Sequence, residues 1–192
     1  MTIVDELIDP NPYSRPGFQL RGVWALIVHW TAAPGQTSKD VRVYYQGRAR
    51  GNDGYGSAHV GIDPDGSIHR WVPETEVAYA VGASGHIDPT SGKLFTDQAR
   101  EIFKAYATPN TSPNFVTLSA EWMTSDALGT FTSAEYDAAI QLYAAWAKKY
   151  QLDPMTRILT HKQVVGWKDC HKWFVDHPAD LDAFRQKVKE AM

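Results

Sequence analysis

Three residues that lie far apart in the chain, His29, His161 and Cys170, have side chains of the types that hold zinc in proteins. A thiolate and two imidazoles suit a borderline-soft dication such as Zn²⁺. Three protein ligands leave one tetrahedral position open for water, which is typical of a catalytic zinc and not of a structural one. Lys168 lies two residues before this cysteine. The residue types therefore predict one catalytic zinc ion.

Composition limits the function classes that this chain can serve. Its 192 residues, 43% of them hydrophobic, predict a single domain over residues 1–192. A net charge of −3 and a pI near 6.1 give no basic surface for nucleic acid. Cys170 is the only cysteine, so it cannot form an internal disulfide and is a structural thiol, a metal ligand or a nucleophile.

Neither export nor membrane insertion is predicted. The first residues lack a basic segment followed by an apolar one, and no apolar stretch is long enough to cross a bilayer. We expect a protein made in the cytoplasm, without a membrane partner. The sequence carries no signal for an oligomeric state.

Three strands are predicted to end at the candidate site residues. Residues 23–30 form an almost continuous apolar run, typical of a central strand covered on both faces, and His29 lies at its end. Residues 116–122 form a second strand that ends near Glu121, and residues 157–160 a short third one that ends at His161. We therefore expect the zinc site at strand ends on one face of a sheet.

Helices and a hairpin complete the predicted fold. The Pro, Asn and Gly content of residues 1–20 predicts an arm that wraps the surface. Ser38 is expected to cap a helix, and the turn Pro64-Asp65-Gly66 to join two strands, residues 57–63 and 67–72. The remaining predictions are a long insertion at 81–113 with a helix near 97–106, a helix opened by the Thr132–Glu135 capping box, and a terminal helix from 178 to about 191. Strands interleaved with helices predict an α/β fold with a mixed central sheet flanked by helices.

The sequence resembles the type 2 N-acetylmuramoyl-L-alanine amidases, the zinc amidases of phage endolysins and bacterial autolysins, which are related to peptidoglycan recognition proteins. The resemblance covers most of the chain, and the order and spacing of its motifs carry it. These motifs are NPYSRPG at 11–17, IVHWTAAPG at 27–35, SAHVGIDPDGSI at 57–68, VPETEVAYA at 72–80, N-x-x-T-x-S-x-E at 114–121 and H-x8-C at 161–170. The chain departs from the family pattern at Gln163, where aspartate is frequent, and at His171, where proline is common.

The resemblance implies roles for five residues. It assigns the metal to His29, His161 and Cys170, proton transfer to Glu121, and stabilisation of the oxyanion to Lys168. Zinc lowers the pKa of a bound water towards about 7. A carboxylate can then take up the proton and deliver it to the leaving amine, and a fixed cation favours the charge that develops on the amide oxygen.

The implied substrate is the amide bond between N-acetylmuramic acid and L-alanine in bacterial peptidoglycan. Its cleavage strips stem peptides from the glycan and lyses the wall. The expected partner is therefore peptidoglycan, and the expected site of action is the cell wall, reached as a phage lysin or by another route of release.

Other readings of the same residues stay open. Cys170 could be a nucleophile activated by a histidine, in a cysteine amidase or endopeptidase. The chain could also be a non-catalytic peptidoglycan-binding module, although such relatives typically lose the cysteine ligand. A glycosidase built on Glu121 and Asp126 is a further alternative. His59 could line the site or have a structural role.

Overall fold

Parallel pairing joins β2 (Ala25–Trp30) to β5 (Thr117–Trp122) on one side and to β6 (Ile158–Thr160) on the other. These strands belong to a computed structural model that describes residues 2–192. Both β2 and β5 are almost wholly buried and rich in apolar residues, as expected for strands covered on both faces. The predicted central strand is confirmed.

The other half of the sheet contains the one antiparallel strand pair found in residues 2–192. β3 (Val60–Ile62) pairs parallel with β5 and antiparallel with β4 (Ile68–Arg70), and β1 (Ile3–Asp5) adds a parallel edge to β4. The order is β1-β4-β3-β5-β2-β6. Gly66 supports the β3–β4 turn because its φ of +85° suits a residue without Cβ. The predicted mixed sheet and hairpin are confirmed, with shorter strands than expected.

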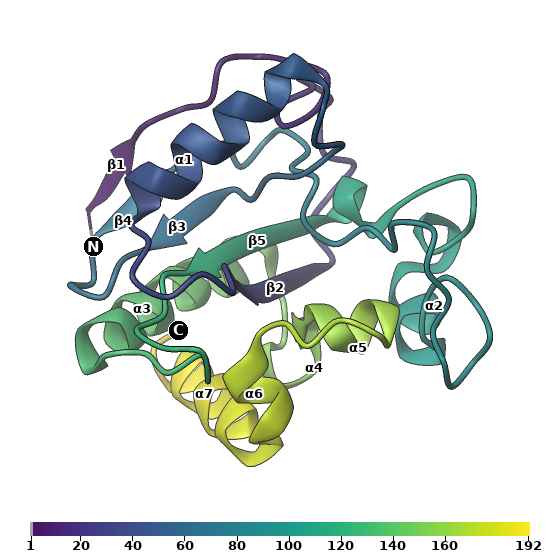
Figure 1. The fold of residues 1–192 in the computed structure, drawn as a ribbon. Coiled ribbons are helices and arrows are strands. Elements are labelled where there is room, and N and C mark those ends of the chain that lie inside the picture. Colours follow the sequence, from purple (N-terminus) through teal and green to yellow (C-terminus); the bar gives the residue numbers. More distant parts are fainter. Residues whose placement is uncertain (1) are drawn as a thin grey trace.

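Helices cover both faces of the sheet, so the α/β fold is as predicted. α1 lies over one face, and α3 and α7 lie over the other (Figure 1). None of the helices in the described part of the chain has the length and apolar character needed to cross a bilayer. The helices are α1 (Ser38–Gly47), α2 (Asp97–Phe103), α3 (Ser133–Tyr150), α4 (Pro154–Arg157), α5 (His161–Val165), α6 (Lys172–Asp176) and α7 (Pro178–Glu190), with 3₁₀ turns η1 (Arg48–Arg50), η2 (Lys104–Tyr106) and η3 (Pro113–Val116).

Alternate residues of β2 enter two different hydrophobic clusters. Leu26 and Val28 pack with α3 and α7, whereas Ala25 and Ile27 pack with α2, α5 and the segment before them. Successive side chains of a strand point to opposite faces, so this division follows from the period of two. His29 therefore continues the face of Ala25 and Ile27.

The segment 81–113 supplies part of this second cluster. Val81, Phe95, Ala99, Phe103 and Ala107 are all buried there against β2 and α5. The predicted helix near 97–106 is present as α2 followed by η2. This segment is thus an integral part of the core.

Three local predictions were wrong in detail. Thr37, not Ser38, caps α1, because Thr37 and Asp40 form a reciprocal capping box while the Ser38 amide donates to Asp63. The third strand ends at Thr160, and His161 begins α5. The N-terminal arm does more than wrap the surface, since β1 extends the sheet and Ile8 is fully buried.

A carboxyl group is buried at the start of α3. Glu135 has no exposed surface. Its backbone amide donates to the hydroxyl of Thr132, the N-cap residue of α3. Burial, and to a smaller extent the nearby carboxylate of Asp63, raises the pKa of Glu135 to about 8. The folded protein thus keeps this proton over a pH range in which the unfolded chain loses it.

We predict that Glu135→Gln removes a pH-dependent loss of stability. An unfolded glutamate titrates near pH 4.3, so the wild-type free energy of unfolding falls as the pH rises from about 5 to 8, by on the order of 1 kcal/mol or more. Urea unfolding at several pH values should therefore show that the free energy of unfolding of the variant increases relative to that of the wild type across this pH range. The exposed control Glu190→Gln should not. Parallel pH profiles for the wild type and Glu135→Gln would contradict the prediction.

Candidate metal centre

Strand register places His29 beside Glu121. The two residues are Cα partners in the parallel β2–β5 pair, and both side chains point to the sheet face opposite the α3 cluster. On the other side of Glu121 in the register is Gly61 of β3. A Cβ at Gly61 would lie 2.4 Å from Trp71 and 2.5 Å from the Ser38 hydroxyl, so glycine lets α1 approach the sheet closely here.

His161 is held by the cap of α5. The Thr160 hydroxyl accepts from the Gln163 amide, and the Gln163 side chain accepts from the Thr160 amide, which gives the departure at Gln163 a capping function. The Nε2 atom of His161 lies 3.4 Å from the Gly82 carbonyl. A carbonyl only accepts, so this contact places the proton on Nε2 and leaves the lone pair of Nδ1 free, as a metal ligand requires.

Cys170 lies in the loop after α5, which is fastened to the end of β2. The Trp30 indole donates to the Asp169 carbonyl at 3.1 Å, and the Lys162 amide donates to the Cys170 carbonyl at 3.1 Å. The Trp30 amide points at the sulfur, 3.5 Å away. These contacts bring Cys170 Sγ to 3.3 Å from His29 Nδ1.

The structure brings the three predicted ligands together. One ligand atom from each of His29, His161 and Cys170 lies within 4.8 Å of the others. Tetrahedral zinc with Zn–N near 2.0 Å and Zn–S near 2.3 Å separates its ligand atoms by roughly 3.3 to 3.6 Å, close to the observed sulfur–nitrogen distance. These donors fit a zinc ion.

Burial sets the protonation states of this cluster. Desolvation, with smaller contributions from His161 and Lys168, lowers the pKa of His29 well below its usual value. Desolvation, and then Lys168, lowers the pKa of His161 to about 3. Both imidazoles are thus neutral, the form that binds metals. Loss of hydration and the nearby Glu121 raise the pKa of the Cys170 thiol. A bound cation opposes this last effect and favours the thiolate.

Glu121 and Lys168 lie next to the three ligands. The Tyr45 hydroxyl donates to the Glu121 carboxylate at 3.1 Å, from the buried side of α1. Burial raises the pKa of Glu121 to about 7, while this hydrogen bond and the charge of Lys168 act in the opposite direction. The Lys168 ammonium sits 5.5 Å from the centre of the Trp167 ring. The site thus combines a carboxyl that titrates near neutrality with a nearby cation.

Tyr45 and Gly82 are site residues that sequence reasoning missed. The helical spacing of Val41 and Tyr45 predicts a shared buried face, but only the fold shows that the Tyr45 hydroxyl reaches Glu121. Gly82 acts through its backbone carbonyl, which its residue type does not reveal.

Two other candidate residues have structural roles. The Asp126 carboxylate accepts from the backbone and side chain of Thr130 and from the Leu128 amide, which ties it to its own loop and not to Glu121. His59 is fully buried, with one ring nitrogen on the Ser119 amide and the other on the Glu76 carbonyl. Both nitrogens of His59 are therefore occupied within the protein.

The comparisons with known proteins agree with this fold. The family model described as N-acetylmuramoyl-L-alanine amidase matches residues 19–173. A Bacillus licheniformis protein named "Probable N-acetylmuramoyl-L-alanine amidase" is 31% identical over 97% of this chain and 47% of its own length. The N-acetylmuramoyl-L-alanine amidase BlyA of Bacillus subtilis is 28% identical over 96% of this chain and 46% of its own.

Solved structures show the same fold. The catalytic domain of PlyG superposes with a TM-score of 0.71 at 20% identity, over 100% of this chain and 95% of that one. The catalytic domain of XlyA gives 0.67 at 17% identity, over 96% and 99%. The chain belongs to the N-acetylmuramoyl-L-alanine amidase family. It spans about half the length of the curated relatives that it matches.

The segment 81–113 contacts α5 and the loop after it, which carry His161 and Cys170. Besides the Gly82 carbonyl, the Thr96 hydroxyl donates to the Gln163 carbonyl and the Thr96 amide to that of Val164. Asp88 packs so closely on Gly166 that a Cβ there would lie 2.0 Å from its carboxylate. That carboxylate accepts from the amides of Thr90 and Ser91, so it is not free to move.

We predict that Gly166→Ala weakens metal binding. The new methyl would collide with Asp88 in a residue whose φ is +81°, which shifts the loop between His161 and Cys170. Zinc titration with a competing chelator should show at least a tenfold loss of affinity, by analogy with changes to groups that orient metal ligands.

Gly85→Ala is the matched control, since its φ is +78° but its Cβ would meet no atom within 4 Å. It carries the backbone strain, about 1 kcal/mol, without the collision. Equal zinc affinity in the two variants would show that the contact between Gly166 and Asp88 does not hold the loop.

Proposed function

We propose that this protein is a zinc-dependent amidase that cleaves the bond between N-acetylmuramic acid and L-alanine in peptidoglycan. The observation that supports it most strongly is the convergence of two neutral imidazoles and one sulfur within 4.8 Å, beside Glu121. The amidase family and the names of the relatives supply the bond class. Peptidoglycan is then the partner and the cell wall the place of action.

Each polar residue of the site has a role in this reaction. When bound by His29, His161 and Cys170, zinc would activate a water molecule and polarise the amide carbonyl. Glu121 takes the proton from the attacking water and returns it to the leaving amine, a task suited to a carboxyl whose pKa is about 7. Lys168 supplies positive charge near the amide oxygen as the carbon becomes tetrahedral.

A cysteine-nucleophile mechanism has one observation in its favour, the 3.3 Å distance between Cys170 Sγ and His29 Nδ1. The electrostatics favour a metal instead. A nucleophilic cysteine needs a lowered pKa, whereas loss of hydration and Glu121 raise the pKa of this thiol. A catalytic pair made of Cys170 and His29 alone would also leave His161 without a role.

We predict that Cys170→Ser loses zinc and activity together, whereas Glu121→Ala retains zinc and loses turnover by a factor of at least 100, as expected for a general acid–base residue. The measurements are zinc content by elemental analysis and release of amino groups from purified cell walls. Asp137→Ala, on the exposed side of α3, is the control for removal of a carboxylate.

Chelation separates the two mechanisms. The metal mechanism requires that chelator abolish activity and that zinc restore it. Activity that survives chelation but is lost on thiol alkylation would establish a cysteine nucleophile. Release of reducing sugar ends in place of amino groups would indicate a glycosidase.

We also predict that Tyr45→Phe lowers kcat roughly tenfold, the usual effect of losing one hydrogen bond to a charged group. The hydroxyl holds Glu121 in place, so zinc content and KM should be unchanged. Tyr44→Phe is the matched control, because Tyr44 is exposed and its hydroxyl accepts from Arg48 instead. An unchanged kcat in Tyr45→Phe would mean that Glu121 is oriented by other contacts.

A further inference from the structure

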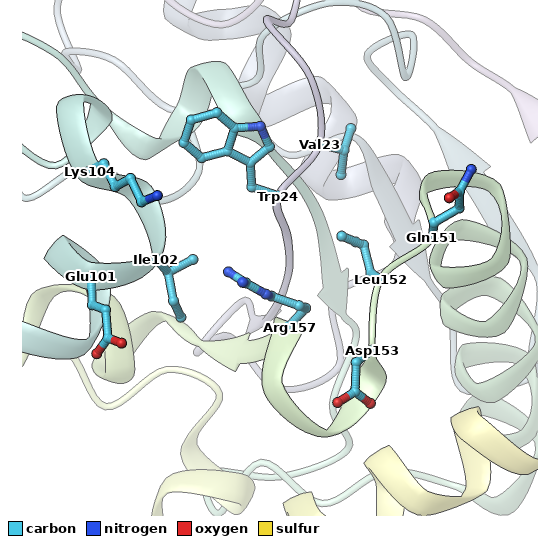
Figure 2. Close-up of a pocket in the computed structure, with 9 residues that line it drawn as sticks. All are labelled: Val23, Trp24, Glu101, Ile102, Lys104, Gln151, Leu152, Asp153 and Arg157. Carbon is cyan, nitrogen blue, oxygen red and sulfur yellow. The ribbon is translucent and has the colours of Figure 1, made fainter.

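A cavity separate from the metal centre opens at the other end of β2. Its volume is about 360 Å³, within the range of small-ligand sites. Trp24 comes just before β2, five residues before His29, so at about 3.3 Å per residue the two ends lie roughly 16 Å apart. Figure 2 shows the lining residues, which are Val23, Trp24, Glu101, Ile102, Lys104, Gln151, Leu152, Asp153 and Arg157.

Arg157 is the unusual member of this lining. Its guanidinium points into the space between Trp24, Ile102 and Leu152 (Figure 2). Among the described residues it has no hydrogen bond or ion pair within the protein, although its side chain is partly buried. The other arginines that are partly or wholly buried all have partners, namely Arg15, Arg42, Arg48, Arg70 and Arg185. A guanidinium that is sheltered but unpaired has its donors free for a ligand.

The charges around Arg157 favour an anion. The Lys104 side chain extends to the same side of the cavity as the Trp24 indole, whereas the carboxylates of Glu101 and Asp153 turn away from the guanidinium (Figure 2). Asp153 is already occupied, since it caps α4 by accepting from the Met155 amide. The lining thus contains two cations and two carboxylates, but among the described residues neither Arg157 nor Lys104 forms an ion pair, so both cations can pair with an anionic ligand.

The remaining walls are apolar. The Trp24 ring is held edge-on against Tyr106, with ring centres 5.2 Å apart, and Ile102 and Leu152 complete the surface. Such walls suit a ligand that carries a small apolar or sugar-like body beside its anionic group. Guanidinium forms two parallel hydrogen bonds to a carboxylate, which fixes orientation as well as charge.

We propose that this cavity is an accessory site for the free carboxylate of a short peptide, as carried by the stem peptides of peptidoglycan. Arg157 binds the carboxylate, Lys104 adds charge, and Trp24 packs against the peptide body. The assignment of the carboxylate to peptidoglycan rests on the proposed function, whereas the recognition of an oxyanion by Arg157 does not. Phosphate groups of anionic wall polymers offer the same chemistry from another source.

The test follows the indole N–H signals in NMR spectra, with the Trp24 signal assigned by its loss in Trp24→Phe. The probes are N-acetyl-D-alanyl-D-alanine, its C-terminal amide, and glycerol 3-phosphate. We expect the peptide acid to shift the Trp24 signal and the amide to leave it unmoved. Arg157→Met should weaken the effect roughly tenfold or more, whereas Arg50→Met, which removes an exposed arginine outside the cavity, should not.

Each outcome bears on the proposal. A shift by glycerol 3-phosphate alone, lost in Arg157→Met, supports the oxyanion site and assigns it to wall polymers. No shift of Trp24 with either anion, or the same shift in Arg157→Met as in wild type, overturns it. The readout requires neither zinc nor turnover, so failure of the amidase proposal would leave this result unaffected.

Discussion

The parallel register of β2 with β5 and β6 is the constraint on which the site depends. It sets His29 opposite Glu121 and places Val28 beside Thr160, the residue before His161. Ligands in α/β proteins gather at the carboxyl ends of parallel strands, and this cluster follows that rule. A slip of one residue would turn His29 or Glu121 to the face covered by α3. The apolar side chains that alternate with them prevent that slip.

Exclusion of water is the second requirement of the site. His29 and His161 are almost completely buried, which keeps their imidazoles neutral. Loss of hydration at Glu121 itself raises the pKa of that carboxyl to about 7. Removing three potential metal ligands from water costs stability, and proteins tolerate such a cost where function needs it. The same burial keeps both imidazoles in the neutral form that binds a cation.

Local patterns predicted most of the elements. The apolar run of β2, the Pro-Asp-Gly turn and the Thr132 cap each depend on neighbouring residues, so they could be read from the sequence. The edge strand β1 could not, because Ile3–Asp5 is too short a run to show an alternating pattern and only pairing with β4 makes it a strand. Thr37 and Ser38 are both good caps, and the position of Asp63 decides between them.

The residues of the candidate site also divide into those that the sequence predicts and those that depend on packing. Metal-ligand types and family motifs identified His29, His161 and Cys170, which the structure brings together. The contact from Tyr45 and the carbonyl of Gly82 depend on how α1 and the segment 81–113 pack, which no local pattern encodes. The unpaired guanidinium of Arg157 could not be predicted from the sequence either. Whether an arginine finds a partner depends on which residues the fold places around it.

Substitution with Co²⁺ tests the central claim most directly, because its absorption spectrum reports ligand type and geometry together. We predict an intense thiolate-to-cobalt charge-transfer band and strong tetrahedral d–d bands at one equivalent of metal. Cys170→Ser should lose the charge-transfer band. A weak octahedral spectrum without that band, or a spectrum unchanged in Cys170→Ser, would contradict a metal held by His29, His161 and Cys170.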